Sequence, residues 1–257
     1  MIFFSVSCFK EISLQCNFTP LKKQGQVFGG FFSHLWLAKR GLMCYIFIMM
    51  DIQKALDALV PNPTCELNFQ TTFQLLVAVV LSAQCTDARV NKVTKSLFQK
   101  YPSAKDFANL SVETLGKEIY SLGFYRAKAK NLIEMSKAIL ENFGGEVPCT
   151  MEELTTLSGV GRKTASVVLA EGFNIPAFAV DTHVFRVANR LGIGDEKSPE
   201  ACETALKNFF PQESWAKTHL QMVLFGRYTC KAQNPKCTGC PFQPICKYFQ
   251  KRIKNVS

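Results

Sequence analysis

The stretch that most constrains this fold is Leu157–Lys163, where a single residue separates Gly159 from Gly161. Upstream, Thr150 and Glu153 have the spacing of a capping box at a helix start, and an apolar, helix-compatible run follows downstream. Glycine enters φ > 0 without a Cβ clash, so the glycines predict a hairpin between two short helices. Backbone N–H groups at the second helix's start would suit an anion such as a nucleic-acid phosphate. Such glycine pairs also occur in ordinary helix–helix turns, so this motif alone establishes no function.

The composition is compatible with a globular protein that binds a polyanion. With 257 residues and 47% apolar content, the chain can bury one large core or two small ones. Its net charge of +10 suits DNA or RNA. Seven of its eleven cysteines are scattered singly, as in a reducing cytosol, so we expect a cytoplasmic protein. The apolar run at residues 42–50 is too short to cross a bilayer, so no membrane partner is expected.

Residues 1–49 differ from the rest of the chain. They are rich in phenylalanine and lack helical or strand periodicity. Met49 and Met50 directly precede a clean helical pattern at residues 51–59. We therefore expect translation to start at one of these methionines, with residues 1–49 an extension that is unstructured or not translated.

Helix start and stop signals alternate through the remainder, and no convincing pair of alternating strands is present. The patterns predict helices at residues 51–59, 73–83, 88–101, 103–110, 111–122, 126–143, 182–191 and 212–227, with a further one starting at Ser198-Pro199. The predicted fold class is all-α.

Four cysteines crowd into seventeen residues near the C-terminus: Cys230, Cys237, Cys240 and Cys246. Two disulfides fit poorly with the free cysteines elsewhere. Zinc sites usually use two short cysteine knuckles, and one such pair exists here. A [4Fe–4S] cluster suits four cysteines strung along one loop, so the spacing favours a cluster and leaves zinc open. Lys231 and Lys236 make this loop basic, as a solvated face or as phosphate contacts.

Several motifs occur together in one order: Glu66-Leu-Asn-Phe69, Leu81-Ser-Ala-Gln84, the hairpin with Lys163, Val180-Asp-Thr-His183, Gly226-Arg-Tyr-Thr-Cys230 and the cysteine quartet. In this combination the chain resembles the endonuclease III family of DNA base-excision glycosylases, from about residue 50 to residue 248. The resemblance implies two helical lobes with the active site in the cleft between them. One would be a six-helix barrel with the helix-hairpin-helix, residues 65–175. The other, residues 50–64 and 176–257, would hold a structural or redox-sensing [4Fe–4S] cluster.

The resemblance assigns the chemistry to Lys163 and Asp181. The Lys163 amine would attack C1′ of an everted nucleotide, displace the base and form a Schiff base, after which β-elimination expels the 3′ phosphate. A helix N-terminus with Arg162 adjacent should favour the neutral, reactive amine. Asp181 would stabilise the cationic C1′. Without the resemblance, Lys163 could be a plain phosphate ligand and Asp181 a helix N-cap.

The resemblance also suggests DNA contacts. Gly159, Val160, Gly161 and Arg162 of the hairpin would grip a phosphate, and Gln84 would fill the gap left by the flipped nucleotide. Phe124 stands where the family commonly has a leucine wedge, and an aromatic ring can intercalate equally well. Phe225 stands where the family usually has histidine before Gly-Arg.

The resulting prediction is a monomeric, bifunctional DNA glycosylase and apurinic/apyrimidinic (AP) lyase. Its substrates would be oxidised pyrimidines and abasic sites in double-stranded DNA. An adenine glycosylase of the same superfamily is one alternative, but such enzymes usually lack the hairpin lysine and carry an extra C-terminal domain. A DNA-binding iron–sulfur protein without catalysis is the other.

Overall fold

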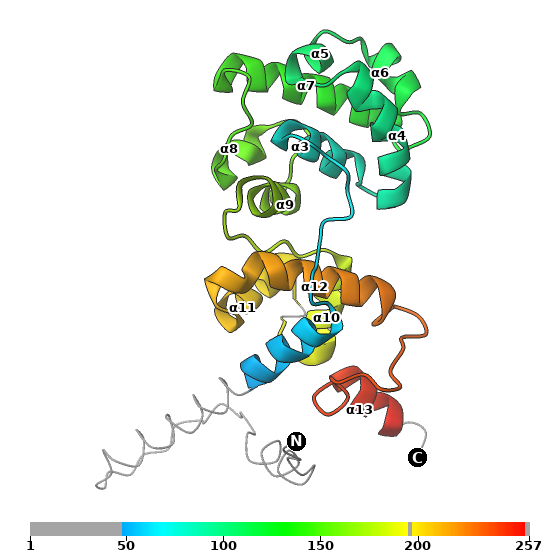
Figure 1. The fold of residues 1–257 in the computed structure, drawn as a ribbon, viewed down its shortest axis with the longest axis vertical. Helices are drawn as coiled ribbons and strands as arrows, with labels where there is room; N and C mark the ends of the chain where they lie inside the picture. The colour runs from blue at the N-terminus through cyan, green and yellow to red at the C-terminus, as the bar shows by residue number, and fades with distance from the viewer. Residues whose placement is uncertain (1–47, 195–196, 255–257) are drawn as a thin grey trace, which may run out of the picture.

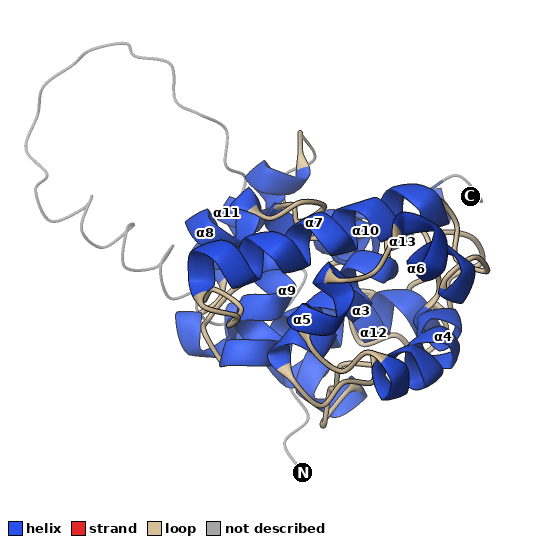
Figure 2. Ribbon diagram, turned by 90° about the horizontal axis from the view of Figure 1, so that it is seen from above, coloured by secondary structure: helices blue, strands red, loops and turns tan. Residues whose placement is uncertain are grey.

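The structure, a computed structural model, describes residues 48–194 and 197–254. Within these ranges the chain forms helices and loops and no β-strand (Figure 2). The all-α fold class is therefore confirmed. The prediction that residues 1–49 are an extension lies outside the described residues, except that residues 48 and 49 are helical.

The helices divide between two halves of the molecule (Figure 1). A helix at residues 48–59 comes first in the described part of the chain and lies in the lower half. The upper half holds α3 (Thr72–Leu81), α4 (Asp87–Lys100), α5 (Ala104–Ala108), α6 (Val112–Glu118), α7 (Tyr125–Phe143), α8 (Met151–Thr156) and α9 (Arg162–Phe173). The lower half also holds α10 (Thr182–Leu191), α11 (Pro199–Phe209), the 3₁₀ turn η1 (Gln212–Ser214), α12 (Trp215–Tyr228) and α13 (Lys247–Lys254).

The upper half is organised around α3, whose residues from Phe73 to Leu81 are all buried. A helix that is apolar nearly all round is stable only when neighbours cover every side. Here α4, α7 and α9 pack against it. Fully buried residues from the surrounding helices, such as Phe107 and Leu132, complete this first core.

The lower half has its own core, built from segments far apart in the sequence. Ile52 and Leu56 of the first helix are buried in one cluster with Phe178, Val184 of α10 and Met222 of α12. Two separate apolar clusters in one chain are typical of two packed units. We propose that they are the cores of two domains, residues 65–175 and residues 50–64 with 176–257.

Polar contacts join the halves. The guanidinium of Arg227, near the end of α12, pairs with Glu66 and with Asp87 at the start of α4. The Arg227 Nη1 to Asp87 Oδ2 distance is 2.6 Å. The halves therefore meet through specific ion pairs as well as through the linking segments at residues 60–71 and 174–181 (Figure 1).

Local signals set most helix ends. Ser103 and Asp106 form a full capping box at the start of α5, and Gly144 ends α7 in the left-handed conformation. The capping box predicted at Thr150 is half formed. The Thr150 hydroxyl accepts from the Glu153 N–H and donates to the Glu153 carboxylate at 2.7 Å, but the Thr150 N–H does not donate to that carboxylate.

The predicted helix at residues 212–227 is divided into η1 and α12. The Ser214 hydroxyl donates to the Pro211 carbonyl at 2.8 Å, and the Ser214 N–H donates to the same oxygen. These bonds tighten the first turn into a 3₁₀ turn.

Candidate active site and cysteine cluster

The predicted hairpin forms between α8 and α9. Gly159 has φ +78°, and a Cβ at this position would lie 2.9 Å from the Asn131 amide nitrogen, so the turn requires glycine on two counts. Gly161, by contrast, is the N-cap of α9 with φ −94°. The turn therefore depends on positive φ at Gly159 alone of the two, because a chain enters a helix through an extended N-cap.

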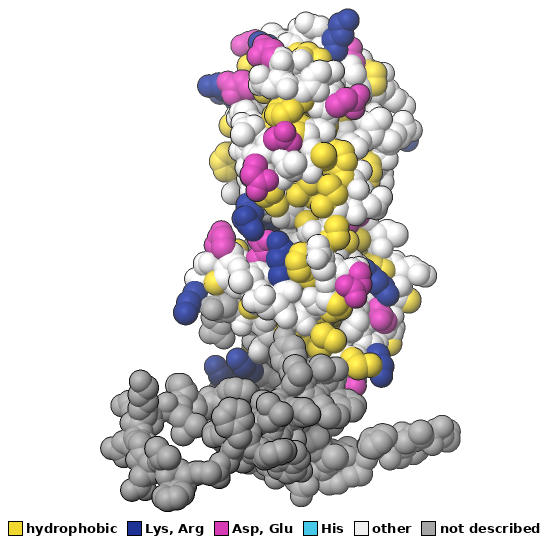
Figure 3. Space-filling model, turned by 90° about the vertical axis from the view of Figure 1, so that its left-hand side faces the viewer, with side chains coloured by type: hydrophobic (Ala, Val, Ile, Leu, Met, Phe, Trp, Pro, Cys, Tyr) yellow, Lys and Arg dark blue, Asp and Glu magenta, His cyan; other side chains and the backbone are white. Residues whose placement is uncertain are grey.

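Two hairpin side chains have partners within the protein. The Val160 side chain is buried in the first core, so only the backbone of this residue is available to bind a ligand. Arg162 forms a bidentate pair with Glu203 of α11, at 2.8 and 2.9 Å, and Lys207 donates to the same carboxylate. Figure 3 shows basic and acidic side chains side by side at the level where the two halves meet. Arg162 therefore helps to join the halves, a role that its position in the sequence does not indicate.

Lys163 and Asp181 stand at the starts of two helices, one in each half. Lys163 is exposed in the first turn of α9. Asp181 is the N-cap of α10, and its Oδ1 accepts from the N–H groups of His183 (2.9 Å) and Val184 (2.7 Å). Asp181 Oδ2 accepts no hydrogen bond from another described residue. The carboxylate is thus fixed by one oxygen and presents the other.

A buried histidine of α12 lies within electrostatic reach of both groups. His219 is 4% exposed, and burial lowers the pKa of its imidazole. The Asp181 carboxylate opposes that lowering of the pKa and the Lys163 ammonium adds to it. Lys163 and Asp181, which start helices in different halves, therefore both influence this one buried ring.

We predict that His219 makes stability depend on pH. Burial lowers the pKa of the His219 imidazole in the folded state, so below pH ~6.5 the unfolded state binds more protons than the folded state does. The free energy of unfolding should fall with pH below that value, by at most about 1.4 kcal/mol per pH unit. Urea titrations between pH 7 and 5 would measure this slope. His219→Asn should flatten it and His183→Asn should not; equal slopes in both variants would contradict the prediction.

Gln84 and Phe124 share an unusual backbone. Gln84 has φ 56° and Phe124 has φ 57°, both in the left-handed region that non-glycine residues seldom adopt. Both side chains are exposed, Phe124 by 69%. Such conformations persist where the surroundings enforce them, and they concentrate at functional sites.

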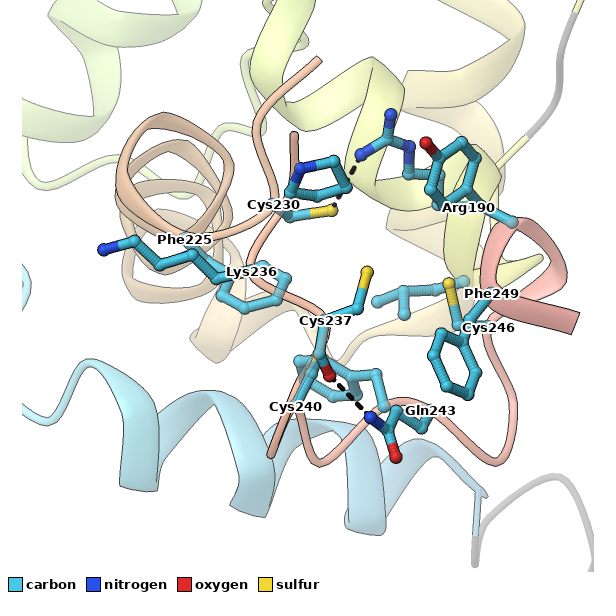
Figure 4. Close-up of a pocket in the computed structure, with 13 residues that line it drawn as sticks. Arg190, Phe225, Cys230, Lys236, Cys237, Cys240, Gln243, Cys246 and Phe249 are labelled. Atoms are coloured by element: carbon cyan, nitrogen blue, oxygen red, sulfur yellow. Dashed lines mark hydrogen bonds between the residues drawn. The ribbon is translucent and has the colours of Figure 1, made fainter. Parts of the chain in front are cut away.

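The four clustered cysteines line one hollow. All four are free thiols, and the hollow holds about 380 Å³ of free space out to its open mouth. Figure 4 shows the Cys230, Cys237 and Cys246 sulfurs turned toward that space. Burial raises the pKa of the Cys240 thiol, and the other three raise it further. Among the described residues, no group of three or more His, Cys, Asp or Glu is disposed to hold a metal ion.

Arginines from α10 surround the first cysteine. Arg190 Nη1 donates to Cys230 Sγ at 3.3 Å, and the guanidinium stacks over the Tyr248 ring at 4.0 Å. Arg186 Nε donates to the Cys230 carbonyl at 3.0 Å. Phe225 forms one wall of the hollow, where its ring packs edge-on against Phe242 at 5.3 Å.

The surface lysines of the cysteine loop are both exposed. Lys236 borders the hollow (Figure 4), and the Lys231 carbonyl accepts from Arg190 at 2.8 Å. No helix in the described part of the chain is long and apolar enough to cross a membrane.

Comparison with known proteins decides the family. Residues 77–212 match the HhH-GPD superfamily base excision DNA repair protein family. The chain is 52% identical over 195 residues to "Endonuclease III" of Bacillus subtilis, covering 76% of this chain and 89% of that protein. The chain belongs to the endonuclease III family. It is a base-excision repair enzyme, a DNA glycosylase and AP lyase.

Other relatives agree. Endonuclease III of Escherichia coli K12 is 44% identical over 191 residues, covering 74% of this chain and 90% of that protein. A solved structure of a trapped endonuclease III–DNA covalent intermediate is 45% identical, with a TM-score of 0.77, covering 80% of this chain and 98% of that one. This family member therefore shares both sequence and fold with a protein seen bound to DNA.

Some residues at the site of this endonuclease III family member have no signal in the sequence. Glu203, His219 and Arg190 each act on a predicted residue from another helix. They carry no local motif. Their role depends on which helices pack together, which periodicity alone does not reveal.

Proposed function

We propose that this glycosylase and lyase, whose substrates are oxidised pyrimidines, uses Lys163 as nucleophile and Asp181 as the group that stabilises positive charge. C1′ is unreachable inside a duplex, so the damaged nucleotide must first leave the stack. The Lys163 amine then forms a bond to C1′ as the glycosidic C–N bond breaks, and the base departs with that electron pair and gains a proton. Opening of the sugar ring gives a Schiff base.

The second step follows from the iminium. It acidifies the C2′ hydrogen, whose removal allows the C3′–O bond to break and the 3′ phosphate to leave. Water then hydrolyses the imine and frees Lys163. Asp181 Oδ2 would lie beside the positive charge that develops at C1′ as the base departs.

The observation that carries this proposal is the placement of Lys163, exposed in the first turn of α9, and Asp181, the N-cap of α10, which both influence the pKa of the buried His219. The two residues start helices in different halves, so a nucleotide turned out between the halves would meet both. The covalent endonuclease III–DNA intermediate trapped in a relative supports the same chemistry for this chain.

The protein would bind double-stranded DNA as a monomer, through residues that take no part in the reaction. The hairpin backbone at Gly159 to Gly161 would bind one phosphate at the start of α9. Lys231 and Lys236 would add contacts from the cysteine loop. Gln84 and Phe124 would occupy the space that the flipped nucleotide leaves.

The cysteine hollow fits a [4Fe–4S] cluster. Four free thiols, strung along one loop, line a space beside arginine side chains. That arrangement favours a multi-atom cluster over zinc. Cys230, Cys237, Cys240 and Cys246 would be its ligands, and the cluster would hold the loop without taking part in base removal.

The test uses a duplex with one oxidised pyrimidine and sodium borohydride, which reduces a Schiff base to a stable adduct. Wild-type enzyme should form an adduct that maps to Lys163. We predict that Asp181→Asn slows base release by on the order of 10²-fold or more, because the charge beside C1′ is lost. Asparagine is also a good N-cap, so α10 should remain intact.

A preformed abasic site supplies the control. Its aldehyde reacts without a base leaving, so Asp181→Asn should slow adduct formation there much less. Equal slowing on both duplexes would argue against the assigned role of Asp181. Absence of a wild-type adduct would overturn the proposed mechanism itself.

A further inference from the structure

Lys128 is a buried lysine of α7 with no part in the chemistry above. The residue is 6% exposed, and a buried ammonium is costly unless its protons are bonded. Its Nζ donates to the carbonyl oxygens of Leu81 (2.9 Å) and Ala83 (2.8 Å) and to Cys85 Sγ (3.4 Å). An ammonium has three protons, so these bonds satisfy it fully.

The three acceptors surround Gln84. Residues 82–85, hereafter the Gln84 loop, follow the end of α3, and Gln84 is exposed there in the left-handed conformation. Glutamine is disfavoured in that conformation, so the loop would relax without an external restraint. Lys128 supplies the restraint by bonding residues on both sides of Gln84.

The same lysine is bonded to Phe124. The Lys128 backbone N–H donates to the Phe124 carbonyl at 3.0 Å, in the first turn of α7. Phe124 is the N-cap of that helix, exposed and also left-handed. Lys128 thus holds Phe124 through its backbone N–H and the residues around Gln84 through its ammonium.

We propose that Lys128 is a positioning residue that holds Gln84 and Phe124 as one rigid unit, so that both side chains enter the DNA together. This inference rests on the proposed function and extends it to how the duplex is opened. Extruding a paired nucleotide costs stacking and pairing energy, and side chains already in place avoid the further cost of being ordered. A nucleotide without a pairing partner needs less of this help.

The test is Lys128→Met, which keeps an unbranched chain of similar length and removes the charge. Single-turnover excision would be measured on two duplexes, with the oxidised pyrimidine either paired or in a one-nucleotide bulge. We expect the rate to fall on the order of 10²-fold on the paired duplex, as for other misplacements remote from the chemistry. On the bulge the loss should stay below about tenfold.

Two variants separate positioning from folding. Lys137→Met makes the same change at an exposed site of α7 and should keep wild-type rates on both duplexes. Lys128→Arg can still donate to several acceptors and should restore most of the paired-duplex rate. An equal loss on both duplexes, or no rescue by arginine, would mean a general structural role and would overturn the inference.

A double substitution gives an independent readout. If Lys128 acts through Gln84, Lys128→Met should add little once Gln84→Ala has removed that side chain, whereas independent effects would multiply. Multiplying effects would overturn the inference. An inactive wild-type enzyme would instead reject the proposed function, so the two failures are distinguishable.

Discussion

Lys163→Gln is expected to abolish the borohydride-trapped adduct and to reduce strand cleavage by on the order of 10⁴-fold or more. An amide nitrogen has no lone pair available for attack on C1′, so no Schiff base can form. The lysine is exposed at the start of α9 and does not belong to the first core, so the fold should be unaffected. Denaturing gels would measure the adduct and the cleaved strand, and circular dichroism would measure the fold.

A DNA-binding measurement distinguishes loss of the nucleophile from loss of DNA binding. Lys163→Gln should still bind an abasic duplex, since the hairpin backbone and the loop lysines are retained. Lys137→Gln, at an exposed site of α7, should give wild-type trapping. If Lys163→Gln still forms adduct, another amine is the nucleophile and the assignment of Lys163 is overturned.

The helices could be predicted because their signals are local. Ser103 with Asp106, Ser198 with Pro199, and Gly144 each lie within a few residues of the end that they set. Helix α13 was not predicted. It has eight residues and no buried side chain, and Arg190 of α10 stacks on its Tyr248. A neighbouring helix, rather than its own pattern, accounts for that contact.

The residues of the candidate site likewise fall into those that local motifs predict and those that they do not. The sequence motifs indicated Lys163 and Asp181, and their catalytic roles remain predictions. The residues that act on the site lie far away along the chain. Arg162 and Glu203 are 41 residues apart, and Lys128 and Leu81 are 47 apart. No local rule relates residues so distant, because their contact exists only once the helices have packed.

Gly161 illustrates a different limit. Its residue type is compatible with either sign of φ, so the pair of glycines does not say which of them makes the turn. The structure has Gly159 in that conformation and Gly161 extended. Composition could identify the hairpin, but only the course of the backbone into α9 determines which glycine makes the turn.

Cys237→Ser is expected to eliminate bound iron and to unfold the loop between α12 and α13. The segment has little apolar burial, since Phe242 and Pro235 are buried while residues 231–234 are exposed, and Arg190 bonds two of its carbonyls. The energy of metal binding then becomes folding energy, and its loss should lower the free energy of unfolding by more than about 3 kcal/mol. Iron and sulfide analysis, limited proteolysis and denaturant titration would measure these effects.

The control for this prediction is Cys149→Ser, the same change at an exposed cysteine outside the quartet. That variant should keep its iron, its protease resistance and its DNA affinity. Loss of the folded loop in Cys237→Ser should also weaken duplex binding, by about tenfold at moderate salt, because Lys231 and Lys236 are then no longer held in place. The salt dependence of binding should become shallower for the same reason. A Cys237→Ser protein with an intact loop would show that hydrogen bonds within the loop suffice to order it, such as that from Gln243 Nε2 to the Cys237 carbonyl at 2.5 Å. The cluster would then have to be assigned some purpose other than holding the loop.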